Sequence, residues 1–182
     1  MRRTRTRYFI GVEGEGEGGF IAWLKDLADE AGLHVHYDAR VLGGGDPLHM
    51  VQKALRELRQ AQPGFAARLL LLDADRFDAV RERGEQARRL AQRSGIELFL
   101  QEPDQEAVLL RLHVGHEQDL AASPALRPLQ RVWPDYTKPT SRKILANRFA
   151  TADLHRARLR NRMLDDLLIA LDLTRDVTEP PA

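Results

Sequence analysis

The chain contains no cysteine, which excludes a disulfide framework, a thiolate metal site and a cysteine nucleophile. It also has no apolar run near the ~20 residues that a membrane span needs, and its arginine-rich start is not followed by an apolar stretch with a cleavage site. Hydrophobic residues make up 43% and charged residues 30% of the 182 residues, a composition typical of a folded globular chain. We therefore expect a soluble, cytoplasmic protein with no membrane partner.

Charge is unevenly distributed, although the formal net charge is only +1. Residues 1–120 carry 17 basic against 20 acidic residues, whereas residues 127–162 carry ten basic against two acidic residues. A basic segment of this kind predicts contact with the backbone of a nucleic acid, DNA or RNA, without reading its sequence. The candidate backbone-binding residues are Arg142, Lys143, Arg148, Arg156, Arg158 and Arg160. The alternative is a solvated helix face.

Strand-type and helix-type patterns alternate along the first part of the chain. Strands are expected at residues 8–12, 33–41, 69–72 and 96–100. Helices are expected at residues 20–31, 47–58, 76–93 and 105–114. The four consecutive leucines at 69–72 indicate a strand buried on both faces. The sequence therefore predicts an α/β fold of Rossmann or Toprim type, with a four-stranded, mainly parallel sheet flanked by helices.

Two parts of the chain are expected to differ in organisation. Residues 1–118 would form the α/β domain, and residues 119–182 would pack on it as a loop-rich connection followed by basic helices. Four prolines within residues 116–140 favour the loop-rich connection. Residues 141–173 predict one or two basic helices, and residues 176–182 predict a frayed tail.

A glycine-rich string follows the first strand. Residues 14–19 fit the dinucleotide-binding pattern G-x-G-x-x-G, and Asp38 lies about 20 residues further on. Glu13, Glu15 and Glu17 argue against that interpretation, because they would repel a pyrophosphate. The same carboxylates suit a divalent cation such as Mg²⁺. The alternative for Glu15 and Glu17 is that they complement the dipole of the following helix.

A second acidic pair, Asp73 and Asp75, closes the buried third strand. Residues two apart in a strand point the same way, so both carboxylates are expected to converge with Glu13, which also ends a strand of the parallel sheet. Capping of the next helix by Asp75 is the alternative.

A third acidic site follows the fourth strand. Glu106 begins an apolar helix, where an idle carboxylate would be costly, and a helix would bring it near Glu102. His113 and His116 are three residues apart but have no third ligand in sight, so we interpret them as ordinary surface or helix-end histidines.

Taken together, these residues resemble the Toprim domain and, within it, the RloB-like family. Glu13, Gly14 and Glu17 match the family's E-G-x-x-E signature, and Asp73 and Asp75 match its D-x-D pair. Residues 102–113, EPDQEAVLLRLH, are similar to the segment N-P-x-F-E-x-W-L-L-L-H, and residues 134–138, PDYTK, are similar to the Y-x-K element. The chain departs from the pattern at Glu102 and Val108, where asparagine and tryptophan are usual.

The resemblance implies magnesium-dependent cleavage of nucleic-acid phosphodiesters in a prokaryotic defence system. One or two Mg²⁺ ions, with Mn²⁺ as a substitute, would be the cofactor. The residues implied as metal ligands are Glu13, Asp73 and Asp75, with Glu17 and Glu106 as second-metal or outer ligands. Lys138 would stabilise charge on the phosphate, or act as a general base if the site lowered its pKa.

The alternative function is a non-catalytic subunit of a defence complex that binds nucleic acid or docks a partner. Its support is the small size of the chain, which has no ATPase motif and no large substrate clamp. A partner protein or a homodimer is compatible with either function.

Overall fold

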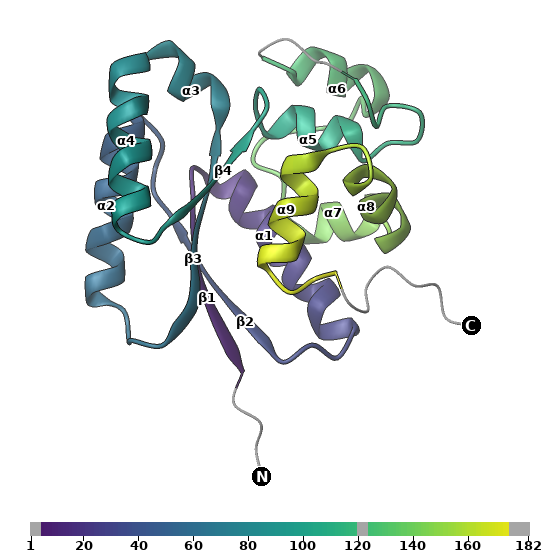
Figure 1. Ribbon diagram of the computed structural model, residues 1–182. Coiled ribbons are helices and arrows are strands. Elements are labelled where there is room, and N and C mark those ends of the chain that lie inside the picture. The colour runs from purple at the N-terminus through teal and green to yellow at the C-terminus, as the bar shows by residue number, and fades with distance from the viewer. Residues whose placement is uncertain (1–4, 120–123, 175–182) are drawn as a thin grey trace.

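The computed structural model describes residues 5–119 and 124–174, which form an α/β fold around one parallel sheet (Figure 1). The strands are β1 (Thr6–Val12), β2 (Val35–Val41), β3 (Phe65–Asp73) and β4 (Glu97–Gln101). They lie in the order β2-β1-β3-β4, and all three neighbouring pairs are parallel. The predicted fold class is therefore confirmed.

Nine helices are present in the described ranges. They are α1 (Glu15–Glu30), α2 (Pro47–Gln60), α3 (Ala74–Ala79), α4 (Arg81–Arg93), α5 (Gln105–Arg111), α6 (Leu126–Val132), α7 (Arg142–Arg148), α8 (Thr151–Arg158) and α9 (Arg162–Ala170). Helices α2, α3 and α4 lie on one side of the sheet, and α1 lies with α5 to α9 on the other (Figure 1). Within the described ranges, no helix has the length and apolar character needed to span a bilayer.

The leucine run of β3 explains the two-layered core. Leu69 and Leu71 pack into the cluster shared with α1 and the C-terminal helices, whereas Leu70 and Leu72 pack into the cluster shared with α2 and α4. All four side chains are at most 1% exposed. Because successive side chains of a strand point to opposite faces, a continuous apolar run is what a strand covered on both faces requires.

The C-terminal helices share the larger of these two clusters with the sheet. Leu145 of α7, Leu154 of α8 and Leu164 of α9 are buried together with Tyr8 of β1 and Trp23 of α1. The packing of residues beyond 119 against the α/β unit therefore shapes the same face of the sheet that carries α5.

The glycine-rich string is part of a helix and not of a loop, because α1 begins at Glu15. The carboxylate of Glu17 accepts a hydrogen bond from the Gly14 backbone N–H (2.9 Å), which satisfies one of the unpaired donors at the helix start. The interpretation of Glu15 and Glu17 as residues that suit a helix start is therefore compatible with the structure, and the helix expected from residue 20 begins five residues earlier.

Three further parts of the chain form helices that differ from those expected. The helix expected at 76–93 is divided at Val80 into α3 and α4, where a Cβ on Gly84 would lie 2.7 Å from the Phe77 carbonyl oxygen. The connection at 116–140 contains α6, whose seven residues are too short for periodicity to reveal. Residues 141–173 form three short helices instead of one or two. The tail expected at 176–182 lies outside the described residues.

Close approach explains why Gly19 cannot carry a side chain. A Cβ built on Gly19 would overlap the backbone carbonyl oxygen of Thr140, and one on Gly16 would overlap the Gln105 side chain. A Cβ on Gly18 would instead meet only side-chain methyls at 3.8 and 3.9 Å, which is ordinary packing. Gly16 and Gly19 are therefore required by close neighbours, whereas Gly18 is not.

We expect Gly19→Ala to lower the free energy of unfolding by about 1–3 kcal/mol, as overpacking against backbone does. Gly18→Ala should raise it by about 0.5–1 kcal/mol, because alanine favours a helix interior over glycine. Urea unfolding of the two variants and the wild type measures the direction of each change in the free energy of unfolding. Equal effects of the two substitutions would contradict the close approach of α1 to Thr140.

Candidate functional site

The carboxyl ends of β1 and β3 bring Glu13 and Asp73 together. Glu13 follows β1 directly and Asp73 is the last residue of β3, and these strands are parallel neighbours in the sheet. The Glu13 Oε2 atom accepts a hydrogen bond from the Asp73 backbone N–H at 3.3 Å. The expectation that the two residues meet at one edge of the sheet is confirmed.

Glu17 joins them from the first turn of α1. Its side chain is buried, and burial raises the pKa of its carboxyl group. Backbone hydrogen bonds lower that pKa in part, and the charges of Glu13 and Glu106 raise it further. Burial also raises the pKa of Glu13, against the lowering effect of the Asp73 backbone N–H.

Asp73 has the most perturbed carboxyl group of this cluster. Burial, followed by the negative charges of Glu17 and Glu13, raises its pKa to about 8. Its Oδ1 atom accepts a hydrogen bond from the Gln105 backbone N–H at 3.0 Å, which ties the end of β3 to the start of α5. A carboxyl group with such a pKa binds a proton at neutral pH unless a cation replaces it.

Glu106, at the start of α5, is 1% exposed and is fully engaged. Its Oε1 atom accepts a hydrogen bond from the Tyr136 hydroxyl (2.7 Å), and its Oε2 atom lies 2.7 Å from Lys138 Nζ. The expectation that a carboxylate at this position would not be idle is confirmed. Both oxygens are held by the chain itself.

Lys138 remains protonated in this setting. Burial alone would lower the pKa of its ammonium group, but the hydrogen bond to Glu106 and the charges of Glu106, Asp73 and Asp104 raise it overall. Of the two roles that the resemblance implies for Lys138, the structure therefore favours charge stabilisation over general base.

A cavity of about 400 Å³ connects these groups. Its walls include Glu13, Glu17 and Asp73 together with Tyr136 and Lys138. In the described part of the chain, no three acidic or histidine side chains are arranged closely enough to hold a metal ion as they stand. The donor set itself consists of hard carboxylate oxygens, which are the ligands that Mg²⁺ prefers.

Asp75 lies near Glu13 and Asp73, since its charge raises the pKa of both carboxyl groups, but it is not among the residues that line the cavity. Because β3 ends at Asp73, Asp75 lies in the first turn of α3, and its backbone N–H donates to the Pro103 carbonyl. It is not a helix cap either, since Asp73 occupies the N-cap position of α3. Glu102 precedes α5 and lines a different cavity, so the structure does not bring it to Glu106.

Much of the basic charge expected to face a nucleic acid is neutralised within the chain. Arg142 pairs with Asp26 at 3.1 Å, and Arg158 pairs with Asp165 at 2.6 Å. Arg156 contacts Glu117 and also pairs with Asp153 at 2.9 Å. The six candidate residues are absent from the walls of the acidic cavity, namely Arg142, Lys143, Arg148, Arg156, Arg158 and Arg160.

The remaining candidates are divided. The Arg148 side chain stacks over Trp133 at 5.4 Å and donates to the Nε2 atom of His113 at 3.3 Å. Lys143 and Arg160 are exposed, and neither has an ion pair within the described ranges.

His113 is a buried packing residue and not a surface histidine. Its ring lies 4.9 Å from that of Phe149, and its Nδ1 atom lies 3.1 Å from the Leu109 carbonyl oxygen. Burial lowers the pKa of His113, which favours the neutral ring. His116 lies 2.6 Å from Asp119. Neither histidine lines the acidic cavity.

Two residues of the cavity were not found by sequence reasoning. Arg76, in α3, lies 3.4 Å from Glu13 Oε1. Gln105 is 4% exposed, and its Nε2 atom is a buried donor that has no hydrogen-bond partner among the described residues. Gly16 was the available signal for Gln105, because a glycine inside a helix often marks a close neighbour.

Comparison with protein-family models, curated proteins and solved structures found no match. Asp73, whose pKa is raised to about 8, shares the cavity with two further acidic residues and a protonated lysine, and this set suits a ligand that carries both divalent cations and negative oxygens.

Without metal, the unfolding free energy should fall as pH rises from about 4 to about 8, because Asp73 has a raised pKa. The folded chain keeps the Asp73 proton over this range while the unfolded chain loses it, so the contribution is fully present below about pH 4 and is lost by about pH 8. Asp73→Asn keeps the acceptor for Gln105 and removes this contribution.

Urea unfolding in EDTA is measured at pH 5 and pH 8 for the wild type and Asp73→Asn. The difference between their unfolding free energies at each pH gives the contribution of the Asp73 carboxyl group. The variant should gain stability relative to the wild type as pH rises. A difference that does not change with pH would mean that the Asp73 carboxyl group titrates normally.

Proposed function

We propose that the chain is a magnesium-dependent nuclease of Toprim type, acting on phosphodiesters of DNA or RNA in a prokaryotic defence system. The observation that carries this proposal is that Glu13, Glu17 and Asp73 line one cavity with a protonated Lys138, at the carboxyl edge of a parallel sheet. Ligands of parallel sheets bind outside this edge. The sequence resemblance supports the same activity.

Glu13, Asp73 and Glu17 are the residues that would hold the metal. When bound, Mg²⁺ or Mn²⁺ would activate water and neutralise charge on the scissile phosphate. The chain prepares the ligands with backbone N–H groups, which orient one oxygen of Glu17 and one oxygen of Asp73. Arg76 balances part of the charge of Glu13 in the absence of metal.

Lys138, held in place by the buried Glu106, is the part of the site that would face the substrate. Glu106 fixes the Lys138 ammonium group at 2.7 Å and keeps it charged, and Tyr136 holds the other oxygen of Glu106. The side chain of Lys138 is 57% exposed, so its charge is accessible to a phosphate oxygen. Its role is to stabilise negative charge and not to remove a proton.

The second candidate is a non-catalytic subunit that binds nucleic acid or a partner. Arg76 favours it, because the ion pair with Glu13 gives the acidic cluster an internal counter-ion. In this case the acidic cavity would be a structural feature, and metal would have no effect on the protein.

Asp73→Asn should lower nuclease activity by at least about 100-fold, since even outer-shell changes at metal sites cost 10–100-fold. The matched control is Asp78→Asn, which makes the same change on an exposed residue of α3 outside the cavity. Plasmid, single-stranded DNA and transfer RNA are incubated with each protein in Mg²⁺, Mn²⁺ and EDTA. Cleavage that persists in EDTA, or at wild-type rate in Asp73→Asn, contradicts the proposal.

Absence of cleavage on all three substrates, together with a melting temperature that does not respond to Mg²⁺, would favour the non-catalytic subunit. A melting temperature raised by Mg²⁺ in the wild type and in Asp78→Asn, but not in Asp73→Asn, would locate the metal at the cavity independently of activity.

Lys138→Met should affect rate and metal affinity in opposite directions. Removing the Lys138 ammonium group lowers the maximal rate because the phosphate loses a stabilising charge. It also lowers the Mg²⁺ concentration needed for half-maximal activity, because one positive charge near the carboxylates is gone. Lys143→Met, on an exposed lysine of α7, is the control. A lower rate together with a higher Mg²⁺ concentration for half-maximal activity would instead mean that Lys138 has a purely structural role.

A further inference from the structure

Two basic side chains line the acidic cavity, Arg76 from α3 and Lys138 from the segment that precedes α7. The Arg76 Nε atom lies 3.4 Å from the Glu13 Oε1 atom. The Lys138 Nζ atom lies 2.7 Å from the Glu106 Oε2 atom. Of these two ion pairs, only that of Arg76 involves a carboxylate that the proposed function assigns to metal binding. Only this pair therefore has to change when the site is loaded.

The pair of Lys138 with Glu106 is fixed by its surroundings. Glu106 is 1% exposed, and its other oxygen accepts a hydrogen bond from the Tyr136 hydroxyl at 2.7 Å. A buried carboxylate that turned away from these partners would lose both contacts without gaining water. Lys138 therefore presents its charge at the same place with and without metal.

Glu13 is held at both oxygens, by contacts of different kinds. Its Oε2 atom accepts a hydrogen bond from the Asp73 backbone N–H at 3.3 Å, which leaves this oxygen further lone pairs for a cation. Its Oε1 atom contacts the guanidinium group of Arg76, which carries a full positive charge. A divalent cation at Oε1 and this guanidinium group repel each other, so the two compete for the same oxygen.

Arg76 has a fixed backbone and an exposed side chain. Helix α3 is held by the buried side chains of Ala74 and Phe77, on either side of Arg76 in the sequence. The Arg76 side chain itself is 56% exposed. Ion pairs with so exposed a partner are weak. The guanidinium group can therefore leave Glu13 while α3 keeps its position in the fold.

The cavity offers the released guanidinium group a place beside an incoming phosphate. Arg76 and Lys138 line the same cavity, so a ligand that brings negative oxygens into it meets both cations. Guanidinium groups bind two phosphate oxygens at once, with stronger hydrogen bonds than neutral donors make. A cation at Glu13 and a phosphate at Arg76 together replace the ion pair, and no charge is left without a partner.

We propose that Arg76 is a substrate-binding residue that pairs with Glu13 in the metal-free protein and turns to a phosphate oxygen of the nucleic acid when the site is loaded. This role of Arg76 rests on the proposed nuclease function. Because the metal and the phosphate both favour the released arginine, each strengthens the binding of the other by the same factor. Arg76 thus links metal binding to substrate binding within one cavity.

Arg76→Gln separates the two parts of this role, because it removes the competitor of the metal and the partner of the phosphate together. The melting temperature of the protein without nucleic acid is measured against Mg²⁺ concentration. The Mg²⁺ concentration at half of the rise should fall about two- to fivefold, the range that such ion pairs are worth. At saturating Mg²⁺, KM for the substrate that is cleaved should rise at least about tenfold, as loss of a charged hydrogen bond does.

Arg76→Lys keeps the positive charge but not the planar fork. It should restore the Mg²⁺ midpoint of the wild type, while KM stays above the wild-type value.

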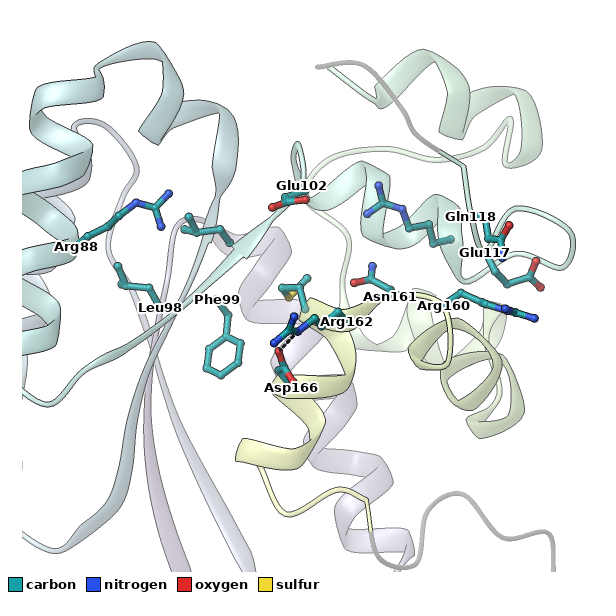
Figure 2. A pocket seen from close by; sticks show the side chains of 13 residues that line it. Arg88, Leu98, Phe99, Glu102, Glu117, Gln118, Arg160, Asn161, Arg162 and Asp166 are labelled. Atoms are coloured by element: carbon teal, nitrogen blue, oxygen red, sulfur yellow. Dashed lines mark ion pairs between the residues drawn. The ribbon is translucent and has the colours of Figure 1, made fainter.

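The matched control is Arg162→Gln, which removes an arginine paired with a carboxylate at another cavity. This cavity, of about 680 Å³, lies beside β4 and shares no residue with the acidic cavity. Figure 2 shows the ion pair of Arg162 with Asp166 on its wall, in which Arg162 Nε lies 3.6 Å from Asp166 Oδ2. The control changes the net charge by the same amount and should leave both the Mg²⁺ midpoint and KM unchanged.

A wild type that responds to Mg²⁺ and an Arg76→Gln variant with the same midpoint would overturn the competition at Glu13. An unchanged KM in Arg76→Gln, or an equal rise in Arg162→Gln, would overturn the contact with the phosphate. Either result leaves the nuclease proposal standing. A wild type whose melting temperature does not respond to Mg²⁺, and which cleaves none of the substrates, would instead contradict the nuclease proposal and this role of Arg76 with it.

Discussion

Negative charge held away from water is the constraint on which the rest of this structure depends. Burial raises the pKa of Glu13, Glu17 and Asp73, and the charges of Glu17 and Glu13 raise that of Asp73 further. The chain answers with backbone donors, because the N–H groups of Gly14, Asp73 and Gln105 each point to one of these carboxylates. Strand ends and helix starts supply such donors, so the cluster can exist only where β1, β3, α1 and α5 meet.

The small residues of α1 follow from the same constraint. The backbone N–H of Gln105 donates to Asp73, and Gly16 of α1 leaves the room for the Gln105 side chain. Gly19 likewise lets the backbone at Thr140 approach α1, which places Lys138 at the cavity. A string that fits a dinucleotide-binding loop thus has a different physical basis here. Its glycines admit protein neighbours and not a pyrophosphate.

The sequence predicted the sheet and the meeting of Glu13 with Asp73, because both depend on patterns several residues long. A buried leucine run indicates a central parallel strand, and parallel strands end at one edge. The position of Asp75 was not predictable in this way. Asp75 lies two residues beyond the end of β3, in the first turn of α3, where its backbone N–H donates to the Pro103 carbonyl oxygen. The sequence also did not reveal Arg76 as the counter-ion of Glu13, because Arg76 lies in α3, just beyond the same strand end.

Charge counted along a sequence is also a poor guide to where an anion binds. The basic excess of residues 127–162 is partly cancelled by acidic residues far away, as in the pair of Arg142 with Asp26, 116 positions apart. Exposed cations that pair in this way contribute little to recognition. Arg111, which lies outside that segment, likewise has opposite charge around it, because Glu102, Asp104 and Asp119 act on its guanidinium group from within the fold.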